Sequence, residues 1–290
     1  MGMLQQIHGK NLNVARLLAL PALAALAIAG ISQTSHAALV ASDNAGSYTS
    51  WTNSSNGGSG FGTWGLSTMG SNAGFFVGSS TANDNGNTLP AGDTGDIDTN
   101  SEAWGMYANS SSLATATRNF TGCALAVGQS FSLAFDNGNI SFGSSDTFSL
   151  LNSSGNALFQ FGFAGGTSDY FYTDSTSTAA STGVGFTYFG LNTLFTLTSN
   201  TTYSLTITPI NPSLAAKTIF GTISGSITGF QAVNDNAGNG STNNFYINSA
   251  AVSAAPGNAV PLPASLGFVL AGGLGLAAMA LSRRRSGMQA

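Results

Sequence analysis

The feature that most constrains this chain is a two-residue alternation in which apolar side chains take turns with serine and threonine. The clearest example, residues 203–208, reads Tyr-Ser-Leu-Thr-Ile-Thr, and related patterns occur at 131–135, 148–150, 158–163, 193–198 and 218–227. Such alternation places apolar side chains on one face of a β-strand and polar ones on the other. Only 6% of the residues are charged, so hydroxyl groups must cover the wet face. The pattern therefore predicts half-buried strands.

Turn-forming segments separate the expected strands, at 136–139, 152–156, 165–168, 209–212 and 234–238. Many short strands at such spacing predict an all-β fold, a jelly roll or β-sandwich. Residues 38–119 are richer in Gly, Ser and Asn but keep large aromatic residues such as Trp51, Trp64 and Trp104. We expect them to form the first strands and long loops of the same sandwich, with a low-complexity spacer as the alternative.

The charged residues are distributed unevenly along the chain. Five of the seven bases lie near the ends, which leaves Arg118 and Lys217 against all eleven acids in the middle, although the formal net charge is only −4. Nucleic-acid binding needs clustered Lys and Arg, so the composition argues against it. An acidic body makes cations the more plausible partners.

The N-terminus has the features of an export signal. A polar, basic region ending at Arg16 precedes the apolar run 17–31, and Ser35-His36-Ala37 supplies the small residues that a signal peptidase requires. We therefore expect a signal helix in residues 1–37, with cleavage between Ala37 and Ala38. An uncleaved N-terminal anchor is the alternative, but the run is short for a bilayer span and is interrupted by Pro21.

The C-terminus carries a second apolar segment. Residues 264–281 contain no charge, which as a helix would extend about 27 Å, close to the thickness of a bilayer core. Arg283, Arg284 and Arg285 follow directly, and the positive-inside rule keeps such a cluster in the cytoplasm. We expect a single transmembrane helix that leaves residues 38 to about 260 on the far side of the inner membrane.

This tail closely resembles a known sorting signal. The order Val260-Pro261-Leu262-Pro263-Ala264, then a Gly-rich apolar segment, then Arg283-Arg284-Arg285, is similar to the VPLPA variant of the PEP-CTERM signal of Gram-negative bacteria. The resemblance implies recognition of residues 260–264 by an exosortase, cleavage there, and transfer to the outer surface or extracellular matrix. The arginines would act as the retention signal. The five residues after the arginines make the tail slightly longer than the family pattern, and a plain single-span anchor is the alternative.

The chain thus divides into a signal peptide (1–37), a cargo domain (38–255) and a sorting signal (256–290). Residues 120–252 resemble the concanavalin-A-like jelly rolls of lectins and glucanases at 135–138, 149–156, 203–207 and 243–247. That resemblance implies a sandwich fold and makes an exopolysaccharide a candidate partner.

Catalytic residue sets are hard to assemble from this composition. Both histidines, His8 and His36, fall in the expected signal, so the exported chain could not form a Ser-His-Asp triad. Glycosidases commonly need two close carboxylates, and Glu102 is the single glutamate. We therefore expect a protein that is not an enzyme.

The candidate binding site is an acidic loop at residues 93–102. Asp93, Asp96, Asp98, Asn100 and Glu102 offer side-chain oxygens at mostly alternating positions, which a turn could wrap around a hard cation such as calcium. The spacing does not match an EF-hand, and a solvated acidic loop is the alternative. A second cluster at 83–87 is typical first of a turn.

These observations predict an exported protein with a structural role in the envelope or biofilm matrix. The alternative is a calcium-assisted, lectin-like carbohydrate-binding surface protein. Calcium is the one cofactor that the sequence suggests.

The sorting hypothesis is tested by deleting residues 260–290. We expect the shortened protein to be exported but lost from the surface, while the native chain yields a mature product cleaved near Pro261, as measured by mass spectrometry. Replacing Ser286 to Gln289 with alanine is the matched control and should leave deposition unchanged. Normal surface deposition of the deletion variant would contradict the hypothesis.

Overall fold

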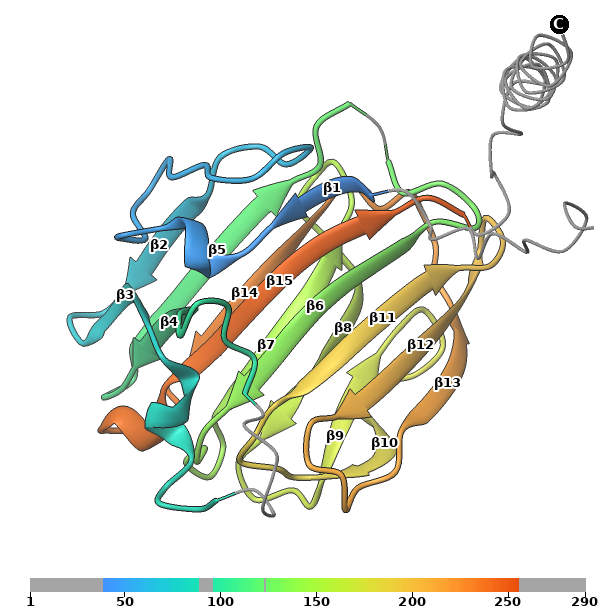
Figure 1. Ribbon diagram of the computed structural model, residues 1–290. Helices are drawn as coiled ribbons and strands as arrows, with labels where there is room; N and C mark the ends of the chain where they lie inside the picture. Colours follow the sequence, from blue (N-terminus) through green and yellow to red (C-terminus); the bar gives the residue numbers. More distant parts are fainter. Residues whose placement is uncertain (1–38, 89–95, 123, 256–290) are drawn as a thin grey trace, which may run out of the picture. The chain divides into compact units, whose positions relative to one another are not determined.

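The computed structural model describes residues 39–88, 96–122 and 124–255. This part of the chain is all-β, with two antiparallel sheets packed face to face (Figure 1), which confirms the predicted β-sandwich. The predicted signal helix, the transmembrane helix at 264–281, the motif at 260–264 and the arginine cluster lie outside the described residues. Within the described ranges, no helix is long and apolar enough to cross a membrane.

The chain crosses several times between the two sheets. The first sheet contains, from edge to edge, β13 (Lys217–Thr222), β12 (Thr202–Pro209), β11 (Leu191–Leu197), β6 (Ser130–Asn137), β15 (Phe245–Ser253), β4 (Ala103–Ala108) and β3 (Ala73–Gly78), and β1 (Leu39–Asp43) also pairs with β15. The second sheet contains β10 (Ala180–Gly185), β9 (Asp169–Thr173), β8 (Ala157–Ala164), β7 (Ser145–Leu151), β14 (Gly229–Asp235), β5 (Leu113–Asn119) and β2 (Gly65–Met69). Three short 3-10 helices are η1 (Ala45–Ser47), η2 (Ser80–Asn83) and η3 (Ser241–Asn243).

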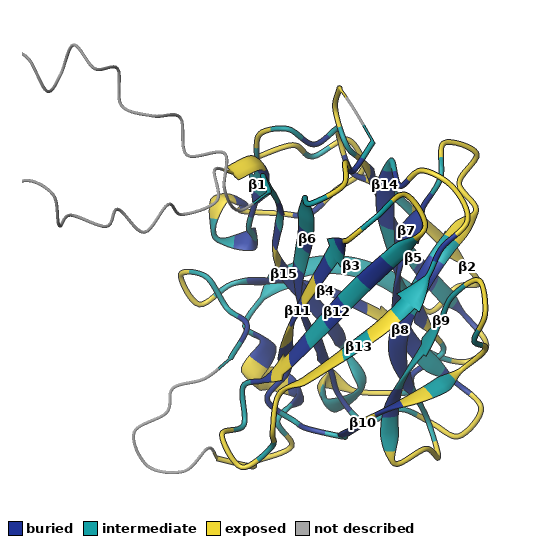
Figure 2. Ribbon diagram, turned by 90° about the vertical axis from the view of Figure 1, so that its right-hand side faces the viewer, coloured by how far each residue is buried: buried dark blue, intermediate teal, exposed yellow. Residues whose placement is uncertain are grey.

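The main core lies between the sheets and consists largely of aromatic rings. The alternation read from the sequence sends Phe131, Leu133 and Phe135 of β6 inward, where all three are buried. Phe135 lies 5.4 Å from the ring of Phe161 and 4.7 Å from that of Phe245. Figure 2 shows buried residues running along the strands of both layers. Contacts of this kind contribute beyond simple burial of apolar area.

Two strand limits differ from the sequence prediction. Residues 136–139 were expected to form a turn, but β6 continues through Asn137 because Tyr246 and Phe245 of β15 pair with Asp136 and Asn137. The strand expected at 218–227 instead ends at Thr222, and Gly225 adopts a φ of +129°, which favours glycine. The first difference is important because it places Asp136 on a strand.

Residues 39–119 supply strands to both sheets, as expected for the early part of one sandwich. Buried Arg118 of β5 holds these segments together by pairing with Asp43 of β1 and donating to the carbonyl of Gly62 at 2.7 Å. Its guanidinium carbon also lies 5.1 Å from the ring of Phe61 and 4.9 Å from that of Trp64. The positive charge is therefore compensated on all sides by a carboxylate, a carbonyl and two aromatic faces.

Replacing Arg118 with methionine should destabilise the protein by about 3–5 kcal/mol, because Asp43 would keep a buried charge without its partner. Chemical denaturation measures this change. Lys217→Met is the matched control, since Lys217 is exposed on an edge strand, and it should leave stability nearly unchanged. Equal stability of the two variants would show that the Arg118 pair is not needed to hold β1.

Candidate metal centre

A second, smaller core lies on the outer face of the first sheet. It consists of Ile97, Ala103, Ala134 and Tyr246, with Phe76 packed against it. In Figure 1 the described residues between β3 and β4, 79–88 and 96–102, lie over this face of the sheet. The segment therefore covers positions of β6 and β15 that would otherwise face solvent.

Asp136 is buried under this cover. Its position two residues after Ala134 points its side chain to the same outer face, and its relative exposure is 0%. Neither carboxylate oxygen has a hydrogen-bond partner in the described part of the chain. A Cβ added at Gly190 would lie 2.9 Å from the Asp136 Cβ, so the backbone of Gly190 also packs closely against Asp136. A buried carboxylate without a partner is costly, which indicates that something else compensates it.

Two further carboxylates converge on Asp136. Asp84 follows η2, Asp96 precedes Ile97, and one oxygen from each of the three acids lies within 4.8 Å of the others. The buried oxygens Asp84 Oδ1 and Asp96 Oδ2 also lack a hydrogen-bond partner among the described residues. Calcium binds oxygen at about 2.4 Å, so two ligands on opposite sides of one ion lie about 4.8 Å apart. The three acids are thus close enough to share one ion.

Neighbouring hydroxyl groups hold two of the acidic segments together. The Asp98 carboxylate accepts hydrogen bonds from the Ser79 hydroxyl at 2.6 Å, and from the Ser80 backbone and hydroxyl at 2.9 and 2.8 Å. The Ser80 hydroxyl also bonds Asp96. Asp98 therefore fixes η2 against the acidic loop, which positions Asp84 and Asp96.

The surroundings of the three acids disfavour their charged forms. Burial, together with the charges of Asp96 and Asp98, raises the pKa of Asp84 to about 7. Burial and the charge of Asp98 raise the pKa of Asp96 to about 6. Burial, followed by the charges of Asp96 and Asp84, raises the pKa of Asp136 well above its ordinary value. A bound cation would reverse all three effects, because it stabilises the carboxylate forms.

Of the five cation ligands predicted from the loop sequence, the structure brings one into the group of three acids. Asp96 belongs to the group of three acids, whereas Asp93 lies outside the described residues. Asp98 binds η2. Asn100 is exposed in a left-handed turn with φ of +54°, and the backbone of Glu102 closes that turn with Thr99 at 3.1 and 2.9 Å.

Sequence reasoning missed the role of Asp84 and Asp136. The turn predicted at 83–87 is present, with the Asn87 backbone donating to the Asp84 carbonyl at 2.9 Å, but the sequence does not indicate where the Asp84 carboxylate points. At 136–139 the predicted turn is wrong, because β6 continues through Asn137. The sequence does contain a signal for Asp136. The alternation at 131–135 places Ala134 on the outer face, and if the strand continues, Asp136, two residues later, lies on that same face.

The chemistry of the three acids suits a hard cation. Carboxylate oxygens are the ligands that calcium prefers, and no nitrogen or sulfur donor belongs to the group. Three negative charges offset a divalent ion, with backbone oxygens and water able to complete its shell. Asp84, Asp96 and Asp136 could therefore share one hard divalent cation.

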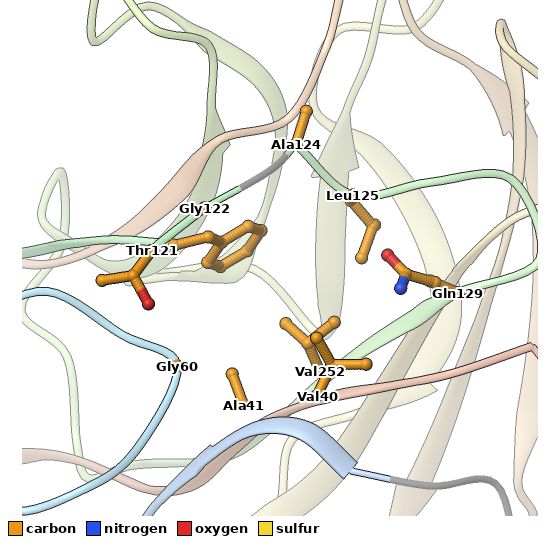
Figure 3. A pocket seen from close by; sticks show the side chains of 10 residues that line it. Val40, Ala41, Gly60, Thr121, Gly122, Ala124, Leu125, Gln129 and Val252 are labelled. Atoms are coloured by element: carbon orange, nitrogen blue, oxygen red, sulfur yellow. The ribbon is translucent and has the colours of Figure 1, made fainter.

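An apolar cavity of about 150 Å³ lies elsewhere, between β1 and the segment 120–129 (Figure 3). Phe120, Leu125, Val40, Val252 and Gln129 are among the residues that line it. None of the described residues that line it carries a titratable side chain.

Comparisons with known proteins give only distant likenesses. No family model matches the sequence, and no curated protein matches it. Among solved structures, a sialidase matches 57% of this chain with a TM-score of 0.38 and 8% identity, although this chain spans only 16% of the sialidase. The calcium-bound exoplasmic domain of VIP36 matches 55% of this chain and 81% of its own, with a TM-score of 0.36 and 8% identity. An adhesin domain of Lys-gingipain from Porphyromonas gingivalis has a TM-score of 0.25, 11% identity, and coverage of 65% and 91%. Similarity at this level identifies no function, so the function has to be inferred from the site's own residues.

The raised pKa values predict how the calcium-free protein responds to pH. Folded Asp84 and Asp96 hold their protons up to about pH 7 and 6, whereas the unfolded chain releases them near the ordinary carboxyl pKa of 3.8. Their contribution to stability is therefore complete below about pH 4 and lost as pH rises through 6 and 7. We expect the melting temperature in chelator to fall across that range.

The Asp84→Asn, Asp96→Asn double variant is the control for this prediction. It should show a flatter pH profile, because neither position can then titrate. A calcium-free native protein whose melting temperature rises steadily from pH 5 to 8 would contradict the described environment of the two acids.

Proposed function

We propose that this protein is an exported surface or matrix protein with a structural role, whose β-sandwich is completed by one calcium ion. The observation that carries the proposal is the fully buried carboxylate of Asp136, which has no hydrogen-bond partner among the described residues and lies against two further acids. A divalent cation satisfies all three groups at once. No described side chain near them offers a compensating positive charge, because Arg118 is engaged by Asp43 and Lys217 is exposed on β13.

The position of the ligands supports a structural ion. Asp84, Asp96 and Asp136 come from three separate places in the chain, namely the end of η2, the start of the acidic loop and β6. One ion bound by all three would fasten the segment between β3 and β4 to the first sheet. Extracellular proteins commonly use calcium at modest affinity in this way.

The export route in this proposal comes from the sequence. Residues 1–37 would be removed by signal peptidase, and the membrane helix at 264–281 would hold the cargo until an exosortase recognises residues 260–264. The cargo would then reach the outer surface or matrix of a Gram-negative cell, with exopolysaccharide as a candidate neighbour. The excess of acids over bases in the cargo suits a cation-containing exterior.

A second candidate function is calcium-assisted carbohydrate binding. The specific observation in its favour is Phe142, whose side chain is 91% exposed in the loop that follows β6, six residues after Asp136. An exposed aromatic ring can stack on the face of a sugar. This candidate requires that glycan binding disappear when calcium is chelated and when Phe142 is replaced by serine.

Replacing Asp136 with asparagine should weaken calcium binding at least about 10-fold, because the variant loses one of three anionic ligands. Isothermal titration of the full-length protein with calcium measures the affinity. Asp235→Asn is the matched control, since Asp235 is an exposed acid at the end of β14 and should bind calcium as the native chain does.

Two outcomes separate loss of binding from loss of folding. The calcium-free Asp136→Asn protein should be at least as stable as the calcium-free native protein, because the amide replaces a buried acid whose charged form burial and the neighbouring acids disfavour. Unchanged calcium affinity in this variant, or native protein that binds no calcium at millimolar concentration, would overturn the proposal.

A further inference from the structure

A polar groove lies where β1 runs into η1. Its volume is about 330 Å³, which is at the lower end of the range for small-molecule sites. The residues lining it are small and polar: Ser42, Asp43, Asn44, Ser47 and residues 57–59 (Gly-Gly-Ser). The acids of the metal centre are not among them.

The groove has a rigid frame. Ser42 and Ser59 exchange two backbone hydrogen bonds of 2.9 Å, and the Tyr48 hydroxyl accepts from the Gly57 backbone at 2.7 Å. Behind η1, buried Asn248 accepts from the Ala45 backbone at 2.9 Å. A ligand would therefore meet walls that are already in place, which lowers the entropic cost of binding.

Several polar groups in the groove are uncommitted. Asn44 is the N-cap residue of η1, a position at which the side chain normally bonds the helix backbone, yet its side chain makes no such bond. The side chains of Ser42, Ser47 and Ser59 also make no hydrogen bond to any other described residue, and Ser47 is exposed. An amide and three hydroxyls thus remain available as donors and acceptors.

The groove carries no uncompensated charge. Asp43 is its single ionisable lining residue, and its carboxylate is already bonded to Arg118 and the Tyr48 hydroxyl. A charged ligand would find no partner of opposite sign. A neutral ligand with many hydroxyl groups would match the available amide and hydroxyls in both size and hydrogen bonding.

We propose that this groove binds a neutral sugar ring, such as one hexose unit of an uncharged glycan, through Asn44, Ser47 and Ser59. The inference goes beyond the proposed function, and the sugar is held without any metal ligand. It differs from calcium-assisted binding at Phe142, which uses other residues.

The test is affinity electrophoresis of the full-length, detergent-solubilised protein, loaded with calcium, through gels containing dextran, mannan or a neutral galactan. At least one polymer should retard the native chain, and anionic alginate should not compete. The Asn44→Ala, Ser47→Ala double variant should weaken that binding about 10-fold, because two hydrogen bonds of ordinary strength are lost. The matched control is Ser153→Ala, Asn156→Ala in an exposed turn of the second sheet, which should bind as the native chain does.

The outcomes distinguish this inference from the calcium proposal. Sugar binding that persists in Asp136→Asn but falls in the groove variant supports the groove, even if calcium binding fails. Absence of retardation by all three neutral polymers overturns the proposal. Retardation that the groove variant leaves unchanged, or that Phe142→Ser abolishes, overturns it as well.

Discussion

The buried carboxylate of Asp136 is the constraint on which the outer half of this molecule depends. A strand that carries an unpartnered acid on a covered face is unstable unless the cover supplies compensation. Here the cover brings two more acids, Asp84 and Asp96, so the covering segment increases the electrostatic problem instead of relieving it. A cation resolves the conflict, because it turns three mutually repelling groups into a common ligand set.

Two buried polar residues connect the long early segments to the sandwich. Arg118 joins β5 to β1, and Asn248 of β15 joins η1 to the acidic loop by donating to the Ile97 and Glu102 carbonyls at 2.8 and 2.9 Å. Asn248 lies where the pairing of β15 with β6 shifts register, which frees its side chain to serve both sides. In a chain with so few charges, these side chains replace surface ion pairs as long-range connections.

The sandwich could be predicted from the sequence because its strands obey a local rule. In residues 131–135 and 203–208 the alternation alone determines which side chains face the core. The metal centre could not be predicted, because it depends on pairing between strands distant in sequence. Asp136 resembles a turn residue when read with Asn137 and Gly138; the alternation of β6 is a weak signal that the strand continues, and the pairing with Tyr246 shows that Asp136 belongs to it. Asp84 and Asp96 come together through Ser80 and Asp98, and no spacing in the sequence reveals that contact.

The most direct test of the calcium ion is a crystal structure of the protein grown with calcium and measured for anomalous scattering. We expect one peak bonded by oxygens of Asp84, Asp96 and Asp136, at about 2.3 to 2.6 Å from each. A water molecule in that place, with the three acids protonated and hydrogen-bonded to one another, would contradict the account.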